Sequence, residues 1–329
     1  MTDAATGQIE IEVRRATDGT EADLRTDAAA GLGASFKQLP PKYFYDELGS
    51  ELFERITELP EYYLTRAEWE ILRSQADAIV AAADPQCLIE LGSGSATKTR
   101  TLLHAMRRAG ALHTFVPVDI SEAITRQTAA ELIDEYPGLR VHGVICDFER
   151  DLERLPAWGQ RRMFAFLGGT IGNFAPPQRT TFLGRIAHLL GPADTLLLGC
   201  DLVKDPALIE AAYNDSEGVT ERFNKNVLTV LNRELGGDFN LDRFSHRAVY
   251  DPDHQCMDIR LRSAMRQRVR LSGLDLEVDF AAGEDIRTEL SCKFSRESLE
   301  WSLRAAGLEL VEFWTDPAGQ YALSLSRAG

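Results

Sequence analysis

The stretch that decides the fold is Glu90-Leu91-Gly92-Ser93-Gly94. It follows the apolar run Cys87-Leu88-Ile89 and precedes a helix-like segment that opens at Ser95. A strand, a turn with two glycines and the start of a helix together form a loop on which a ligand can lie against bare backbone. The stretch therefore predicts a nucleotide-type binding loop at the carboxyl end of a strand.

Two departures from the dinucleotide-binding fingerprint narrow the choice of ligand. Thr97 occupies the place of the third glycine, and Glu90 stands two residues before the first one. A carboxylate at this point repels a pyrophosphate and suits a ligand that carries an ammonium and a sulfonium, as S-adenosylmethionine does. Lys98 opens the next helix and favours a nearby anion such as the methionine carboxylate, although a solvated lysine explains it equally well.

Apolar runs alternate with helical periodicity along the middle of the chain, and the runs span residues 87–91, 114–118, 140–146, 163–167 and 195–200. This alternation predicts an α/β fold with a doubly wound, mainly parallel sheet. A helix over 296–306 and two strands over 308–314 and 321–326 follow near the end. A parallel sheet that ends in an antiparallel strand pair resembles the Rossmann-like fold of class I methyltransferases.

The segment between these parts has a different pattern. Residues 204–250 have the pattern of helices over most of their length. Polar and apolar residues alternate over 257–261 and again over 269–280 around Ser272-Gly273, as they do in a hairpin. We therefore expect a second, mixed α+β domain that binds the substrate. The expected domains are a methyltransferase domain over 67–203 and 290–329, a substrate-binding domain over 20–66 and 204–289, and a flexible N-terminal segment over 1–19. Within this last segment, polar and apolar residues alternate over 9–13, as they would in an edge strand or a frayed tail.

Two further strand ends carry acids. Asp119 ends the second run, where an acid in a doubly wound fold accepts both ribose hydroxyls. Asp147 ends the third run before Phe148, so a carboxylate can receive an adenine amino group and an aromatic ring can cover the base. Helix capping explains either acid alone. With Glu90, however, acids stand at three successive strand ends, and this favours ligand binding.

The loop after the fourth run, Gly168-Gly169-Thr170-Ile171-Gly172-Asn173, lies where the methyl acceptor usually binds in this fold. The Asn173 amide oxygen can accept a hydrogen bond from an amine and hold its lone pair toward a methyl carbon. Transfer from a sulfonium is an in-line displacement, so positioning and desolvation supply most of the acceleration. A structural loop asparagine is the alternative interpretation.

Composition limits the partners and the compartment. Lys and Arg total 36 against 51 Asp and Glu, which gives a formal charge of -15, so a nucleic-acid substrate is disfavoured. The methyl acceptor is therefore expected to be a small molecule or a protein, and we favour a small molecule and a monomeric enzyme. No apolar stretch has the length of a membrane helix, and no signal pattern opens the chain, so we expect a cytoplasmic protein. The five cysteines lack a CxxC pair, and the histidines lack metal-ligand spacing, so free buried thiols and no metal are predicted.

Beyond the glycine turn, the chain resembles the histidine Nα-methyltransferases of ergothioneine biosynthesis. The resemblance covers about residues 32–326. It rests on Leu39–Asp46, Leu59–Tyr63, Glu90–Gly94, Gly169–Asn173, Asp201–Asp205, Ala281–Glu284 and Thr288–Phe294. Several of these motifs lie outside the general methyltransferase core, which makes the resemblance specific.

The resemblance implies three successive methyl transfers from S-adenosylmethionine to the α-amine of L-histidine, which yield hercynine, with Asn173 and Tyr45 taking part in catalysis. The implied cofactor-binding residues are Tyr45, Gly92, Lys98, Asp119, Asp147 and Phe148, to which the glycine turn adds Glu90 and Gly94. The implied substrate-binding residues are Asn173 and Tyr213 for the amino and carboxylate ends, Tyr62, Glu289 and Ser291 for the imidazole, and Phe53, Gly168, Thr170 and Ile259 for the lining.

Physical chemistry supports this assignment, and alternatives stay open. A buried imidazole needs partners for both ring nitrogens, which Glu289 and a tyrosine hydroxyl can supply. The alternative interpretation is that Tyr62 is a half-buried packing residue, that Tyr213 lies on a helix face, and that Glu289 is a strand residue that faces solvent. Ile259 and Gly169 stand where family members can have methionine and serine, which alters the shape of the substrate site. The rival functions are N-methylation of another amino acid such as tryptophan, a nicotinamide-linked dehydrogenase, and an inert histidine-binding module.

Overall fold

The computed structural model describes residues 7–14, 19–155 and 159–329 of the 329-residue chain. The chain packs into two compact units. Unit 1 takes the chain up to residue 15, residues 67–202 and residues 294–329, and unit 2 takes residues 16–66 and 203–293. Val203 and residues 290–293, which we expected in the methyltransferase domain, therefore lie in unit 2. The role of unit 2 in substrate binding stays a prediction.

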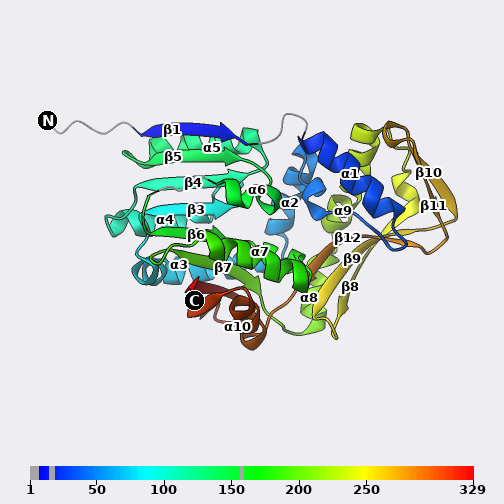
Figure 1. The fold of residues 1–329 in the computed structure, drawn as a ribbon. Helices are drawn as coiled ribbons and strands as arrows, with labels where there is room; N and C mark the ends of the chain where they lie inside the picture. The colour runs from blue at the N-terminus through cyan, green and yellow to red at the C-terminus, as the bar shows by residue number, and fades with distance from the viewer. Residues whose placement is uncertain (1–6, 15–18, 156–158) are drawn as a thin grey trace. The chain divides into compact units, whose positions relative to one another are not determined.

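Unit 1 is built on an eight-stranded sheet in the order β1-β5-β4-β3-β6-β7-β14-β13 (Figure 1). The central strands are parallel: β3 (Cys87–Leu91), β4 (Thr114–Asp119), β5 (Arg140–Ile145), β6 (Arg162–Phe166) and β7 (Thr195–Asp201). The last two strands, β13 (Leu308–Thr315) and β14 (Tyr321–Ala328), are antiparallel to their neighbours. The predicted fold class is confirmed, and parallel pairing brings the carboxyl ends of β3 to β7 to one edge of the sheet.

The first strand corrects one expectation. Residues 1–19 were expected to form a flexible segment, but Gln8–Val13 form β1, which pairs in parallel with β5 from Gln8 opposite Arg140 to Val13 opposite Ile145. The alternating side chains of this stretch suit an edge strand, which has one free side, so backbone pairing outweighs its polar composition. Residues 1–6 and 15–18 lie outside the described residues.

Helices of unit 1 fall into two groups of neighbours. The first group is α3 (Tyr63–Ala83, in unit 1 from Ala67 on), α4 (Thr99–Arg108) and α5 (Glu122–Glu135). Ion pairs join these helices, Asp77 to Arg108 and Arg100 to Glu131. The second group is α6 (Phe148–Asp151), the 3-10 turns Leu152–Arg154 and Thr170–Asn173, α7 (Pro176–Leu189) and α10 (Arg296–Ala305). Among the described residues, no helix is long and apolar enough to cross a membrane.

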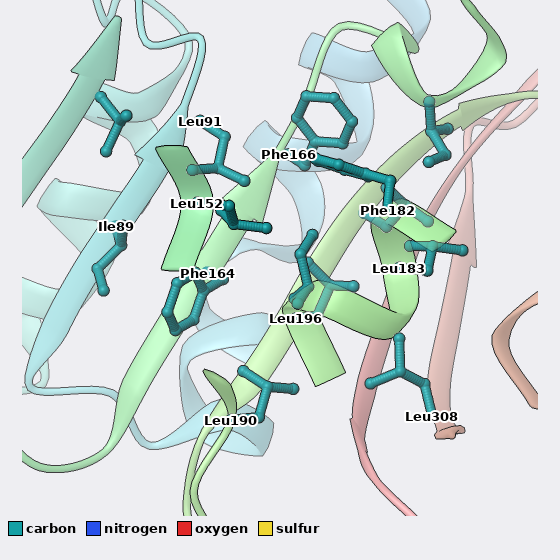
Figure 2. Packing of buried hydrophobic residues seen from close by; sticks show 14 of the residues in the cluster. Ile89, Leu91, Leu152, Phe164, Phe166, Phe182, Leu183, Leu190, Leu196 and Leu308 are labelled. Atoms are coloured by element: carbon teal, nitrogen blue, oxygen red, sulfur yellow. The ribbon is translucent and has the colours of Figure 1, made fainter. Parts of the chain in front are cut away.

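One core cluster of unit 1 lies between the sheet and helices α7 and α10. Alternate strand residues share one face of a sheet, so every second apolar side chain points toward these helices. Figure 2 shows side chains of the cluster, with Ile89, Leu91, Phe164, Phe166 and Leu196 from the strands and Phe182 and Leu183 from α7. Phe174 stacks on Phe182 with ring centroids 4.8 Å apart. This packing anchors the strands at whose ends the candidate site residues lie.

Unit 2 contains a four-stranded sheet in the order β2-β12-β9-β8 and a two-stranded hairpin. The sheet strands are β2 (Lys37–Gln38), β8 (Phe244–Asp251), β9 (Cys256–Ser263) and β12 (Asp285–Cys292), and the hairpin strands are β10 (Gln267–Leu271) and β11 (Leu276–Phe280). The helices are α1 (Gly19–Gly33), α2 (Glu47–Glu58), α8 (Pro206–Tyr213) and α9 (Val219–Leu235), with 3-10 turns at Pro41–Phe44, Leu241–Arg243 and Ser272–Leu274. The hairpin confirms the sequence prediction for residues 269–280. Strand β8 was not predicted, because it lies in the segment 204–250, whose pattern is mainly helical.

The cysteines depart from the prediction of free thiols. Cys87, Cys146 and Cys200 are free and buried, as expected. Cys256 and Cys292 instead form a disulfide. The two residues are directly opposite each other on the antiparallel strands β9 and β12, with their Cα atoms 3.9 Å apart. The prediction of free thiols was wrong for this pair because sequence spacing does not reveal strand register.

Candidate active site

The glycine turn after β3 has the geometry that the sequence predicts. Gly92 and Gly94 have φ angles of 72° and 50°, a conformation that side chains with a Cβ rarely adopt. The N–H of Gly92 donates to the carbonyl of Val118 at 2.8 Å, which joins the turn to the end of β4. A Cβ on Gly92 would lie 3.7 Å from the ring of Phe148. The turn therefore lies beside the end of the neighbouring strand β4 and beside Phe148, which follows β5.

Asp119 is connected to the same turn. One carboxylate oxygen accepts from the N–H of Gly94 at 2.9 Å, and the other accepts from the N–H of Ser121 at 2.9 Å. Asp147 caps α6 by accepting from the N–H of Glu149 at 2.9 Å, as the capping interpretation expects. The ring of Phe148 packs 5.5 Å from that of Phe166. These acids are thus held in place by backbone N–H groups at successive strand ends.

Glu90 lies deeper than the other acids. It is buried, and the hydroxyl of Thr99 lies 2.6 Å from each of its carboxylate oxygens. Burial raises the pKa of Glu90 to about 8; the Thr99 hydrogen bond and the charge of Lys98 oppose this shift, while the charges of Glu68 and Asp119 add to it. A cation brought to this turn would shift Glu90 toward its charged form.

A fourth acid, Glu68 on α3, contacts two of the candidate site elements, and the sequence interpretation did not include it. It is fully buried and forms an ion pair with Lys98. Its Oε1 accepts from the N–H of Gly168 and from the hydroxyl of Tyr321, each at 2.8 Å. A Cβ at Gly199 would collide with the Glu68 and Tyr321 oxygens, so β7 needs a glycine there. Glu68 therefore connects Lys98, which follows the glycine turn, to the loop after β6.

The loop after β6 presents Asn173 at the end of a short 3-10 turn. Gly168 and Gly169 have φ angles of 78° and 72°, so the chain reverses direction there. The Thr170 hydroxyl donates to the carbonyl of Leu167 at 3.1 Å and stabilises the turn. Asn173 is half-buried, and its amide makes no hydrogen bond within the described part of the chain. An amide in this state is available to a ligand.

Unit 2 collects the predicted aromatic residues into one cluster. Tyr45 lies edge-on to Phe53 with ring centroids 5.4 Å apart, and Phe53 lies edge-on to Tyr62 at 6.4 Å. Tyr62 in turn lies edge-on to Tyr213 at 6.4 Å. Phe223 of α9, which the sequence interpretation did not include, contacts Tyr45 at 5.4 Å and Phe53 at 5.9 Å. The cluster is apolar with hydroxyl groups at Tyr45, Tyr62 and Tyr213.

Strand β12 brings the remaining predicted residues together. Glu289 and Ser291 are two residues apart, so they share one face of the sheet, and Ile259 of β9 is directly opposite Glu289. The Ser291 Oγ lies 2.7 Å from the Tyr213 hydroxyl. Lys293, which was not predicted, is buried and donates to both of these oxygens at 2.9 Å. Burial raises the pKa of Glu289 to about 7, and the charge of Lys293 opposes this shift.

The strand order, the glycine turn and the acids at successive strand ends define unit 1 as a class I S-adenosylmethionine-dependent methyltransferase fold. A family model for "Histidine-specific methyltransferase, SAM-dependent" matches residues 24–328. The chain belongs to this family.

Curated relatives agree with the family match. The chain is 50% identical over 311 residues to the histidine N-alpha-methyltransferase of Mycolicibacterium smegmatis, a match that covers 94% of this chain and 97% of the relative. It is 49% identical over 303 residues to the histidine N-alpha-methyltransferase of Mycobacterium tuberculosis, with 92% and 94% covered. It is also 33% identical to ergothioneine biosynthesis protein 1 of Neurospora crassa, over 96% of this chain and 36% of that protein.

The residues of unit 1 fit S-adenosylmethionine. The backbone of the glycine turn is bare, the carboxylate of Asp119 lies beside it, and the ring of Phe148 borders it. The Ser93 hydroxyl in this turn is buried and has no hydrogen-bond partner among the described residues, so a ligand atom can satisfy it. No group of His, Cys, Asp and Glu residues suited to a metal ion occurs in the described ranges. The individual site assignments stay predictions.

Proposed function

We propose that this protein transfers three methyl groups in succession from S-adenosylmethionine to the α-amine of L-histidine, which yields hercynine for ergothioneine biosynthesis. The observation that carries the proposal is the arrangement on β12, where Glu289 and Ser291 share one face and Ser291 lies 2.7 Å from Tyr213. A carboxylate and a hydroxyl supply an acceptor and a donor for the two nitrogens of an imidazole. Relatives that are about half identical carry the matching name.

The role proposed for unit 1 is to bind the methyl donor and to orient the amine. S-adenosylmethionine supplies a methyl group activated by its sulfonium. Asp119 would accept the ribose hydroxyls, Asp147 and Phe148 would hold the adenine, and Lys98 would face the methionine carboxylate. Asn173 would accept a hydrogen bond from the amine with its amide oxygen, because this amide has no other partner among the described residues.

The role proposed for unit 2 is to recognise the rest of histidine. Glu289 and Ser291 would bind the imidazole, together with Tyr62, and Tyr213 would bind the carboxylate end. Ile259 and Phe53 would line the site with apolar surface, and Tyr45 would contact the cofactor during catalysis. A phenyl ring in place of the imidazole would leave the Glu289 carboxyl without a partner, which disfavours phenylalanine.

Each transfer needs a free lone pair on the substrate nitrogen. In the first two transfers a nitrogen–carbon bond forms as the sulfur–carbon bond breaks, and the nitrogen then loses a proton before it reacts again. The third transfer leaves a quaternary ammonium with no proton to lose. Asn173 suits the first two transfers, because an amide oxygen orients the nitrogen through an N–H without binding the proton tightly. The dimethylated nitrogen has no N–H in its free-base form, so in the third transfer the acceleration comes from positioning by the rest of the site and from desolvation.

The test incubates the purified full-length chain with S-adenosylmethionine and each common amino acid in turn and measures product masses. We expect histidine alone to gain three methyl groups. Glu289→Gln should lower kcat/KM for histidine strongly, whereas Glu277→Gln, which changes an exposed acid of β11, should not. Methylation of tryptophan without methylation of histidine would favour the rival methyltransferase, and histidine binding without product would favour a binding module.

Two finer parts of the sequence interpretation also stay proposals. We propose that the chain acts as a monomer in the cytoplasm on this small-molecule substrate. Sedimentation velocity across a range of protein concentrations tests the first part, and fractionation of cells that express the protein tests the second. A mass that rises with concentration, or recovery outside the cytoplasmic fraction, would contradict them.

A further inference from the structure

The disulfide between Cys256 and Cys292 lies at the end of the strand that carries two of the proposed imidazole-binding residues. Cys256 is the first residue of β9, Cys292 is the last residue of β12, and the two are directly opposite each other. Cys292 comes directly after Ser291. The bond therefore restrains the backbone next to Ser291, and none of the roles proposed above makes use of it.

The segment from Glu289 to Cys292 has a strand partner on one side only. On the other side β12 pairs with β2, but among the described residues this pairing covers Ile286 and Arg287 alone. The register against β9 also shifts between Arg287 and Glu289. The segment is thus a short ladder that begins at an irregularity and ends at the disulfide. Because strand ends with few partners open more readily than the centre of a sheet, the covalent bond holds this segment in its register.

The disulfide acts on the proposed substrate residues through the backbone. Neighbouring strand residues point to opposite faces, so the Cys292 side chain points away from the face that Glu289 and Ser291 share. On that face, the Ser291 Oγ lies 2.7 Å from the Tyr213 hydroxyl, and the Lys293 ammonium donates to both oxygens at 2.9 Å. Cys292 stands between Ser291 and Lys293, so a shift of the backbone at Cys292 would move both relative to Tyr213 of α8.

The position of the pair suits exchange with a reductant. Both cysteines are buried, but Cys256 comes shortly after the turn over residues 252–254, which is exposed. Local opening of this strand end would give a reductant access to the sulfur atoms. The three free cysteines belong to unit 1, so unit 2 contains no other thiol with which the pair could exchange.

The chemistry of such an exchange balances without a further reactant. Disulfides are rare in the cytoplasm, the compartment proposed above, and those that form there are mostly transient or redox-sensing. One thiolate of a dithiol attacks a sulfur of the bond and forms a mixed disulfide, and the second thiolate then releases the protein. The protein gains two electrons and two protons as two thiols, and the dithiol becomes a disulfide. The reverse exchange with that disulfide closes the bond again.

We propose, on the basis of the proposed histidine methyltransferase function, that Cys256 and Cys292 form a reversible redox site that sets the affinity for histidine. With the bond closed, the segment from Glu289 to Cys292 is ordered and binds the imidazole. Reduction by a dithiol lets this segment open, and the apparent affinity falls with the fraction of chains that remain ordered. Binding of the methyl donor, which is proposed for unit 1, does not depend on the bond.

The experiment measures binding to the full-length protein by calorimetry, before and after reduction with dithiothreitol. Reduction should raise the Kd for histidine, measured with saturating S-adenosylhomocysteine, about tenfold. The Kd for S-adenosylhomocysteine itself should not change. The double variant Cys256→Ser, Cys292→Ser should bind histidine as the reduced wild type does, with or without dithiothreitol. Cys87→Ser, which removes a free thiol at the start of β3, should respond to dithiothreitol as the wild type does.

A redox titration of the wild type gives a second readout that does not depend on a variant folding. In mixtures of reduced and oxidised dithiothreitol, alkylation and mass spectrometry give the fraction of closed bonds, and the affinity for histidine should follow the same curve. Hydrogen exchange should show that the amides from Glu289 to Cys292 exchange faster in the reduced protein.

An equal Kd for histidine in the two redox states would overturn the inference, as would a parallel loss of affinity for S-adenosylhomocysteine, which would indicate a general loosening of the chain. Both outcomes leave methylation of histidine intact. Oxidised wild type that neither binds histidine nor forms methylated product would instead overturn the proposed function.

Discussion

The carboxylate of Asp119 accepts a hydrogen bond from the backbone N–H of Gly94 at 2.9 Å, so the acid at the end of β4 is bound to the glycine turn that follows β3. The same carboxylate also accepts from Ser121, which fixes its orientation before any ligand binds. A preorganised acceptor loses little entropy when it receives the ribose hydroxyls. The two halves of the predicted cofactor site are thereby held as one structure.

Asp119→Asn should weaken binding of S-adenosylmethionine about tenfold to a hundredfold, because hydrogen bonds to a charged group contribute about 1.5–3 kcal/mol. Asparagine keeps one oxygen for the Gly94 N–H, so the turn should persist. Isothermal titration calorimetry measures the affinity, and Asp134→Asn, an exposed acid on α5, is the matched control. Equal affinities for the two variants would exclude Asp119 from the cofactor site.

Glu90→Gln should change how stability depends on pH. Burial raises the pKa of Glu90 from 4.5 to about 8, so the folded state holds this proton over a range in which the unfolded state has lost it. The contribution of Glu90 to the free energy of unfolding therefore falls as pH rises from about 4.5 to about 8. Glutamine does not titrate. The free energy of unfolding of the variant minus that of the wild type should therefore be larger at pH 8 than at pH 5.

Urea denaturation at the two pH values measures this difference. Glu122→Gln, an exposed acid in the first turn of α5, serves as the control and should show no such trend. A stability difference between Glu90→Gln and the wild type that stays constant from pH 5 to pH 8 would show that Glu90 titrates normally.

Glu68→Gln should destabilise the protein by about 3–5 kcal/mol, because it removes the anionic partner of Lys98 and turns an amide N–H₂ toward buried donors. Tyr321→Phe removes one hydrogen bond to this carboxylate and should cost about 2 kcal/mol. The two effects should not add, since both act on the same carboxylate. Glu70→Gln on the exposed side of α3 should be neutral, and a comparable loss there would assign the effect to the helix alone.

Reduction of the disulfide between Cys256 and Cys292 should lower the free energy of unfolding by about 2–4 kcal/mol, because the bond closes a loop between two strands. The variant with serine at both positions should have this lower stability with or without dithiothreitol. Burial raises the pKa of the Cys87 thiol to about 12, so it should resist alkylation in the folded protein. Five reactive thiols in the unreduced, denatured protein, in place of the three free ones, would disprove the bond.

The parallel sheet could be predicted because its strands are buried on both faces and give continuous apolar runs between helices. The acids Glu90, Asp119 and Asp147 could be predicted from their place directly after such runs. Glu68 could not, because it lies inside a helix with no motif around it, and only the fold brings it to Lys98 and Gly168. Lys293 likewise gains its partners only when Tyr213 of α8 meets the end of β12.

Strand β12 shows a second limit of sequence interpretation. Its register against β9 shifts between Arg287 and Glu289, so Thr288 is an extra residue in a β-bulge. Without the bulge, strict alternation would place Glu289 and Ile286 on opposite faces, and the pattern gives no sign that both face the same way. The prediction of free thiols at Cys256 and Cys292 was wrong for the same reason, since register decides which residues are opposite each other.

The extra residue Thr288 also limits how β12 could be transferred into another protein. A host strand with regular pleating would need the segment from Glu289 to Lys293 shifted by one position, or else its carboxylate, hydroxyl and ammonium would all turn to the wrong side of the new sheet. Thr288 would have to travel with them, together with a partner strand able to accommodate the extra residue.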